Sequence, residues 1–285
     1  MTTARTALIV AALTLREASR RRVLLALSVL TVVLIGLSGW GFSRLAAETG
    51  GTLTTGEARL TASIVLNLVM FGYSLIAALG TAFLAGPTLA GETESGIALS
   101  VLARPIRRSA FLLGKWLGLG TFGSGFVVLA GLAQCLVVRA TVDYWPPRPA
   151  AALALLAAQT AVLLTLAVLL STTISPMASG VVAVGLFCTT WVAGVVGGIG
   201  TSLGNDAIAR VGTVSRMLLP TDGLWRGAMN AFQDPSALTV FGGQDGEAFP
   251  FLSAAPLTAA YLGWAAVWVA MIWGLAAASF LRKDL

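Results

Sequence analysis

The sequence predicts an all-α integral membrane protein with six membrane-spanning helices. Of its 285 residues, 57% are hydrophobic and only 11% are charged, whereas a soluble domain carries about 25% charged residues. The apolar residues also gather in runs of about 20, the length that a helix needs to cross a hydrocarbon core of about 30 Å. Charged residues are nearly absent within these runs, so the runs can lie in lipid.

The first expected element is an amphipathic helix over residues 4–21. One face of this helix collects Leu8, Ala11, Leu15 and Ala18. Four arginines of the segment REASRRR are expected to hold the membrane surface: Arg16, Arg20, Arg21 and Arg22. A cleaved signal peptide is the alternative, but REASRRR is not a small-x-small cleavage site. The helix is therefore expected to lie on the inner membrane surface, with its arginines at the lipid phosphates.

The six spans are expected at residues 23–43, 62–90, 111–138, 150–171, 178–200 and 257–281. Prolines in YWPPRP predict a rigid turn before the fourth span, with aromatic residues suited to the membrane interface. Pro176 separates the fourth span from the fifth, because proline cannot continue a preceding helix. The long connection 201–256 alternates apolar and charged residues at roughly helical spacing. It is expected to form short helices at the outer interface.

Uncharged polar residues within the spans are expected to join helices to one another. They include Asn67, Gln134 and Gln159. In lipid such side chains usually form hydrogen bonds across helices, and contact with a transported molecule along its path is the alternative. Small residues also predict close helix contacts in the third and fifth spans: Gly120, Gly123, Gly125, Gly194 and Gly198.

The distribution of basic residues places both termini in the cytoplasm. In that orientation 11 of the 18 basic residues and only four of the 12 acidic residues lie inside. The basic residues flank the spans and do not form a stripe with aromatic residues, so membrane lipids and not nucleic acid are their expected partners. The chain is expected to be a multi-pass protein of the cell membrane.

Residue types that carry catalytic or metal chemistry are scarce. The sequence has no histidine, which removes the commonest general base and transition-metal ligand. Cys135 and Cys188 lie in apolar runs without metal-ligand spacing, and we interpret them as small core residues. Asp245 and Glu247 favour a solvated turn over a cation site, because two carboxylates without further oxygen ligands hold a hard cation poorly. No metal site is expected.

The densest charge lies in the connection 91–110, GETESGIALSVLARPIRRSA. Gly91 is expected to end the second span. Glu92 and Glu94 are expected to begin a short helix, because carboxylates favour a helix N-terminus. Ile97 and Val101 would form its apolar face. Pro105 would end it, and Arg107 and Arg108 would reach the lipid surface. This helix either anchors the spans or is recognised by a partner.

These features together resemble the type-2 ATP-binding-cassette (ABC) permeases. Gly91-Glu92-x-Glu94-x-Gly96, followed by Leu102, Pro105, Arg107 or Arg108 and Gly114-Lys115, is similar to the first cytoplasmic loop of that family. REASRRR is similar to the family's elbow helix, and FLRKDL at 280–285 to its usual ending. LLPTDGLWR (218–226) resembles an outer motif of the permease that matures nitrous-oxide reductase, but Leu219 stands where that pattern has Asn.

The resemblance implies one permease domain over residues 1–285, in which 91–110 carries a coupling helix that docks on a separate ATPase subunit. The coupling residues would be Glu92, Glu94, Gly96, Ile97, Val101 and Pro105. The resemblance further implies an exporter with two permease copies, identical or paralogous, and two nucleotide-binding subunits that hold ATP and Mg. The sequence has no G-x-x-x-x-G-K-[ST], the loop that cradles ATP phosphates. The chain itself is expected to bind no cofactor and to catalyse no reaction.

Two other functions stay open. A membrane enzyme acting on lipid-linked substrates would use acidic residues of the outer connection, namely Asp206, Asp222, Asp234, Asp245 and Glu247, but no histidine is present to act as a base. A secondary carrier would normally place an acid or a base along its path, and the spans contain almost none.

Overall fold

Six of the helices are long and apolar enough to cross a membrane. The structure, a computed structural model, describes residues 3–20, 22–48, 56–94, 107–234, 250–253 and 255–282. Every regular element in these ranges is an α-helix, which confirms the predicted class. The six are α2 (Arg22–Glu48), α3 (Gly56–Glu94), α5 (Arg108–Val142), α6 (Pro149–Ser171), α7 (Pro176–Ser202) and α11 (Ala259–Arg282).

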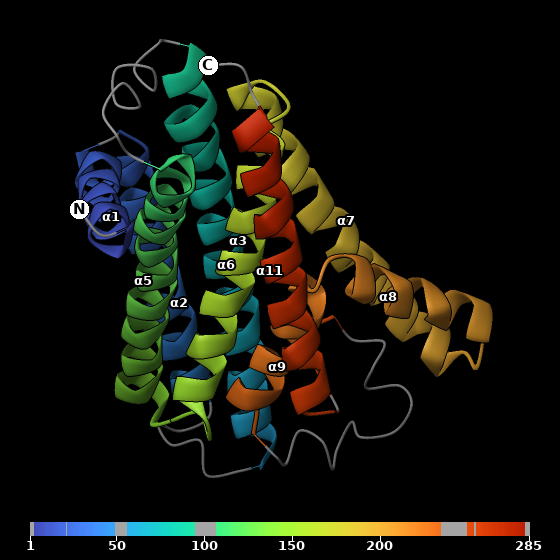
Figure 1. The fold of residues 1–285 in the computed structure, drawn as a ribbon. Coiled ribbons are helices and arrows are strands. Elements are labelled where there is room, and N and C mark those ends of the chain that lie inside the picture. Colours follow the sequence, from blue (N-terminus) through green and yellow to red (C-terminus); the bar gives the residue numbers. More distant parts are fainter. Residues whose placement is uncertain are drawn as a thin grey trace.

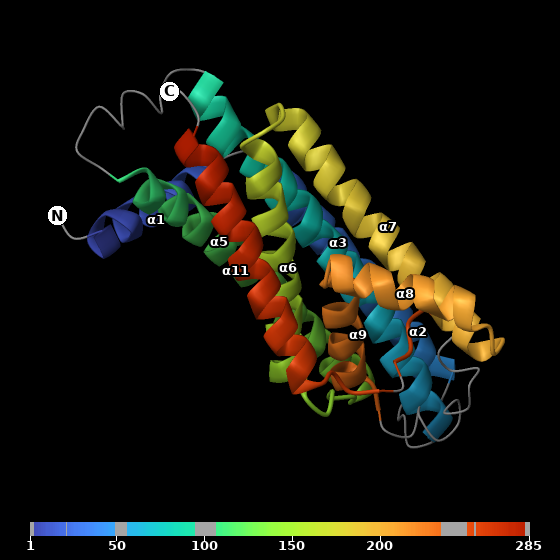
Figure 2. The ribbon, with the colours of Figure 1, turned by 45° about the vertical axis from the view of Figure 1, so that its right-hand side comes forward.

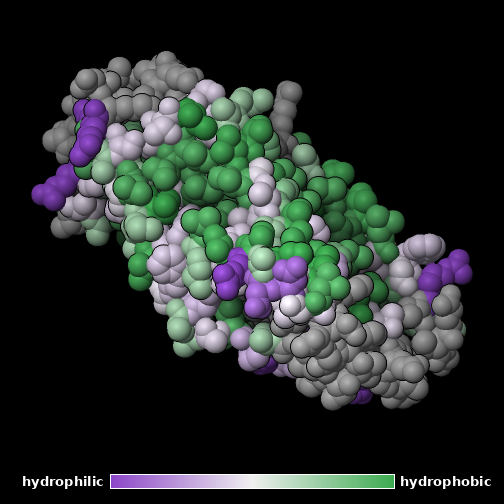
Figure 3. Space-filling model, turned by 90° about the vertical axis from the view of Figure 1, so that its right-hand side faces the viewer, coloured by the Kyte–Doolittle hydropathy of each residue, from purple (hydrophilic) through white to green (hydrophobic). Residues whose placement is uncertain are grey.

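Helix α6 lies at the centre of the bundle and contacts α3, α5, α7, α9 and α11 (Figure 1). In its apolar window 61% of the residues are buried, against 17% for α2 and 28% for α11. The outer helices therefore leave broad apolar faces for lipid or for another protein. Figure 3 shows such a surface, largely hydrophobic, with a hydrophilic patch in its middle.

Helix α3 is longer than the predicted span, and the prediction that Gly91 ends it is wrong. The helix continues through Glu94. Glycine within a helix costs only about 1 kcal/mol relative to alanine, which is too little to stop a long helix. Glu92 and Glu94 therefore occupy the last turn of α3 and do not begin a new helix.

Helix α1 (Thr3–Arg20) crosses α5 instead of running along it, as Figures 1 and 2 show. The crossing is close because α5 presents glycines there. A Cβ atom on Gly114 or on Gly118 would lie 2.7 Å from a carbonyl oxygen of α1, that of Ala7 or of Ala11 respectively. A helix is therefore present where the N-terminal helix was predicted, and it packs on α5. Its place on the membrane surface stays a prediction.

The face of α1 that packs on α5 differs from the predicted apolar face. The residues buried in α1 are Ala7, Val10, Thr14 and Ala18, and only Ala18 also belongs to the predicted apolar set. Most of the buried residues are small, which allows the two backbones to approach. Leu8 is 65% exposed and points away from the protein, so it is free to contact lipid.

We expect Gly118→Val to destabilise the protein by roughly 1–3 kcal/mol, because extra methyl groups in a packed contact force the backbones apart. Gly125→Val is the matched control on the same helix, since a Cβ atom there meets nothing within 4 Å. Thermal unfolding in one detergent compares the two variants. Equal unfolding midpoints would show that α1 does not depend on this contact.

The connection after α7 forms two short helices, α8 (Asp206–Leu218) and α9 (Thr221–Phe232). Helix α8 is capped by Asn205, whose side-chain oxygen accepts from the backbone N–H groups of Ala207 and Ile208. Helix α9 differs from the expected surface helix, because 11 of its 12 residues are buried, largely against α6. Its small residues, such as Gly227 and Ala228, permit this close packing.

Candidate functional site

The connection 91–110 leaves the bundle where α3 ends and α5 begins (Figure 1). Gly96, Ile97, Val101 and Pro105 lie outside the described residues, so the expected coupling helix stays a prediction. Glu92 and Glu94 lie in the last turn of α3. A carboxylate at a helix C-terminus opposes the helix dipole. The dipole of this helix therefore gives no reason for two acids at this place.

The start of α5 contacts the end of α11 beside this connection. Arg107 is exposed at the N-cap of α5. Arg108, which was expected at the lipid surface, donates from Nη1 to the carbonyl oxygen of Leu281 at 3.4 Å. A cation near the last carbonyls of a helix is favourable. The rings of Phe111 and Phe280 stack with centroids 6.2 Å apart, so α5 and α11 are joined here.

Helix α1 is tied to α5 at the same end of the bundle. Lys115 Nζ lies 3.7 Å from Glu17 Oε2, and the lysine side chain is only 9% exposed. Arg16 and Arg20 are exposed on α1, as expected for residues that contact a membrane surface. Arg21 lies outside the described residues, and of Arg22 the structure describes only its place at the start of α2.

The polar residues of the spans bind other helices. Gln134 of α5 accepts from the Tyr73 hydroxyl of α3 at 3.2 Å and donates to the Ser38 hydroxyl of α2. Gln159 of α6 accepts from the Ser74 hydroxyl of α3 at 2.9 Å. All five residues are buried. These bonds favour the helix-joining interpretation over contact with a transported molecule.

Asn67 of α3 binds an outer segment rather than another span. Its Nδ2 donates to the carbonyl oxygen of Phe251 at 3.0 Å, while its Oδ1 has no hydrogen-bond partner among the described residues. Phe251 and Trp191 both lie against the ring of Phe71, with the Phe71 and Trp191 centroids 4.8 Å apart. The segment 250–253 is thereby held against α3 and α7.

A buried ion cluster between α8 and α9 was not predicted. Asp222, 3% exposed, accepts on Oδ2 from Nε of Arg216 at 3.0 Å and from Nε of Arg226 at 3.2 Å. Arg226 also donates from Nη2 to the carbonyl oxygen of Gly194 at 2.7 Å. A Cβ atom at Gly194 would lie 2.2 Å from Asp222 Oδ2, so α7 needs glycine at this point. The spacing of Asp222 and Arg226, four apart on a helix, is the signal that could have found this pair.

Of the acidic residues considered for an enzyme, the three that the structure describes, Asp206, Asp222 and Asp234, do not form a metal-binding group with one another. Asp222 is bound by two arginines, and Asp206 is exposed in the first turn of α8. Asp245 and Glu247 lie outside the described residues. Within the described ranges, no group of three His, Cys, Asp or Glu residues could hold a metal ion.

The hydroxyl of Tyr144 anchors the end of α9 and lies near Asp234. It donates to the carbonyl oxygen of Phe232 at 2.8 Å. Burial raises the pKa of Tyr144 above its usual range, and the charge of Asp234 raises it further. Tyr144 therefore stays protonated and keeps donating throughout the physiological pH range.

The two cysteines are free thiols, and they occupy different surroundings. Cys135 is buried, as the core interpretation requires. That interpretation is wrong for Cys188, which is exposed on α7. A surface that faces lipid or another protein in the membrane is as apolar as a core, so composition alone does not separate the two.

Comparison with known families identifies the family of this chain. The ABC-2 family transporter proteins match residues 8–285, nearly the whole chain. A comparison with curated proteins found no significant match. The matched region includes the six spans, the connection 91–110 and the buried cluster of α8 and α9. The chain therefore belongs to the ABC-2 family of transporter proteins, as a membrane-spanning permease component of an ABC transporter.

Proposed function

We propose that the chain is the membrane-spanning subunit of an ATP-driven exporter. Two copies, identical or paralogous, would work with two separate nucleotide-binding subunits. The observation that carries this proposal is the family match over residues 8–285 together with six apolar helices. The sequence lacks a phosphate-binding G-x-x-x-x-G-K-[ST] loop, so ATP and Mg would lie on the partner subunits.

The connection 91–110 is the proposed contact with the ATPase. Glu92 and Glu94 lie in the last turn of α3, where the helix dipole disfavours carboxylates. Cationic groups of a partner subunit would remove this disadvantage and gain charge-assisted hydrogen bonds. The acids are thus better explained by a partner than by the bundle itself.

Movement of the connection would reach the spans through the elements joined to it. ATP binding would close the two ATPases and push on the end of α3 and the start of α5. Helix α5 carries α1 through the close crossing at Gly118 and contacts α11 through Arg108. A movement at this place would therefore move several helices together and open the path between the two permease copies to the outside. ATP hydrolysis would return the two permeases to their starting arrangement.

The cargo is not indicated by the cluster of α8 and α9. The likeness of residues 218–226 to the outer motif of the nitrous-oxide permease falls on the turn that bears Asp222 and Arg226. Both residues serve contacts within the chain, and Leu219 departs from that motif. The likeness therefore supports a shared outer architecture and not a shared cargo.

Orientation can be tested by cysteine labelling in a variant without Cys135 and Cys188. The proposal requires that a single cysteine at Ser95 reacts with a membrane-impermeant maleimide only after the cells are opened. A cysteine at Asn205, in the exposed turn before α8, should react in intact cells. The cysteine-free protein is the control. Labelling of position 95 in intact cells would overturn both the orientation and the proposed contact with the ATPase.

A further inference from the structure

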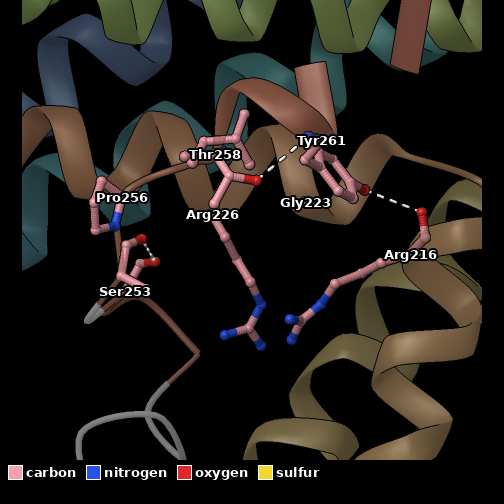
Figure 4. Close-up of a pocket in the computed structure, with 10 residues that line it drawn as sticks. Arg216, Gly223, Arg226, Ser253, Pro256, Thr258 and Tyr261 are labelled. Carbon is pink, nitrogen blue, oxygen red and sulfur yellow. Dashed lines mark hydrogen bonds between the residues drawn. The ribbon is translucent and has the colours of Figure 1, made fainter. Parts of the chain in front are cut away.

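A small polar cavity lies where α8, α9 and the segment before α11 meet. Its volume is about 180 Å³. Figure 4 shows that the guanidinium groups of Arg216 and Arg226 lie next to each other at this cavity. Its other polar side chains are Ser253, Thr258 and Tyr261, the last of which donates to the carbonyl oxygen of Arg216 at 3.0 Å.

Arg216 offers hydrogen-bond donors to the cavity. Asp222 is the carboxylate that both arginines share, and it uses the same oxygen for both. The terminal nitrogens of Arg216 have no hydrogen-bond partner in the described part of the chain, and this side chain is 29% exposed. Guanidinium N–H groups in this fork geometry bind phosphate or carboxylate oxygens in pairs. The cavity is thus suited to an anionic group.

A second, apolar cavity adjoins the first one. Its volume is about 420 Å³, and it shares Gly227, Pro256 and Leu257 with the polar cavity. It extends along α6 past Ala154 and reaches Leu262 of α11. Arg148 and Asn230, which are hydrogen-bonded to each other, also line this cavity, and its other lining residues are apolar or glycine. The polar cavity therefore continues into a mainly apolar groove, which is the pairing that a charged lipid needs.

The surroundings of the cluster also fit the boundary between membrane and water. Helix α8 exposes four large apolar side chains: Val211, Val214, Met217 and Leu218. Trp264 and Trp268 of α11 donate from their indole nitrogens to the carbonyl oxygens of Met217 and Leu218. Tryptophan is enriched at membrane interfaces, where lipid head groups are available.

We propose that the two cavities together bind one anionic membrane lipid. Its phosphate lies on Arg216, beside Arg226, and an acyl chain occupies the groove between α6 and α11. The site lies in the half of the bundle away from the end of α3 and the start of α5 (Figure 1). It depends on neither the ATPase nor the direction of transport.

Native mass spectrometry of the full-length permease can test the site with phosphatidylglycerol and phosphatidylcholine. We expect Arg216→Gln to lower retention of phosphatidylglycerol roughly tenfold or more, because a charge-assisted pair of hydrogen bonds is lost. Phosphatidylcholine retention should not change. Arg210→Gln is the matched control, since Arg210 is exposed on the same helix and lines neither cavity. Unchanged phosphatidylglycerol retention in Arg216→Gln would overturn the proposal.

Two further arms separate a lipid from a free anion and guard against misfolding. Ala154→Phe should fill the apolar groove and lower the retention of phosphatidylglycerol, although Arg216 is unchanged. If inorganic phosphate displaces phosphatidylglycerol and Ala154→Phe has no effect, the site binds a free anion and the lipid proposal is wrong. Arg216→Lys keeps the positive charge but lacks the paired N–H groups of a guanidinium. If Arg216→Gln fails to fold, retention in Arg216→Lys between that of the wild type and background supports the site, and wild-type retention contradicts it.

Discussion

Replacement of both Glu92 and Glu94 by glutamine is expected to abolish coupling to the ATPase while the permease still folds. If these carboxylates are paired and partly desolvated in a cleft of the partner, their loss costs about 2–5 kcal/mol at that interface. That corresponds to a loss of affinity of roughly 30-fold or more. The permease alone should be as stable as the wild type or slightly more so, because two charges that oppose the dipole of α3 are removed. Co-purification and ATPase activity in one detergent measure the effect.

The control removes two carboxylates at the other end of the bundle. Asp143 and Asp206 are both exposed, and the double Asn variant should keep wild-type ATPase binding. Asparagine also tolerates the left-handed backbone of Asp143, where φ is 51°. Wild-type coupling in the glutamine variant would mean that Glu92 and Glu94 are surface residues without a role in coupling.

Asp222→Asn is expected to destabilise the fold by about 3 kcal/mol, because it leaves two arginines facing each other without the carboxylate that they share. The effect should lie at the lower end of the range for broken buried pairs, since the side chain of Arg216 is 29% exposed. The midpoint of thermal unfolding in a single detergent measures it. Asp206→Asn, at an exposed position, should stay within about 0.5 kcal/mol of the wild type.

A second substitution tests whether charge is the cause. Arg226→Gln together with Asp222→Asn restores the net charge of the cluster, so the double variant should be less destabilised than the sum of the two single variants. If the destabilisation of the double variant equals the sum of the two single variants, packing beside Gly194, and not the ion cluster, sets the stability of this region.

The spans could be predicted because their apolar runs have the length that a membrane dictates. Their ends could not, because α3 continues past Gly91, and one glycine destabilises a long helix too little to end it. The glycine contacts of α5 were predicted correctly only in part. A Cβ atom at Gly123 would lie 3.0 Å from Thr160 Cγ2 of α6, as the prediction requires, but one at Gly125 would meet nothing within 4 Å. The contact of Gly118 with α1 was not predicted. Which glycine faces a neighbour depends on the crossing angle of two helices, and a single sequence does not carry that angle.

The site was predictable where it depends on local chemistry and not where it depends on tertiary contacts. Gln134 and Gln159 join helices as uncharged polar residues in lipid usually do. Arg216 and Asp222 meet across the turn between α8 and α9, and the inward position of α9 buries Asp222. No pattern in the sequence distinguishes such a buried turn from the solvated outer loop that its charges suggest.

The most direct test of the proposed function is the composition and activity of the assembly purified from its own membranes through a tag on this chain. Native mass spectrometry should show two permeases, identical or paralogous, with two copies of a subunit that carries G-x-x-x-x-G-K-[ST]. This complex should hydrolyse ATP, the permease alone should not, and the Glu92→Gln and Glu94→Gln double variant should lose the ATPase subunits. A permease that transports as a monomer without any ATPase subunit would contradict the proposal.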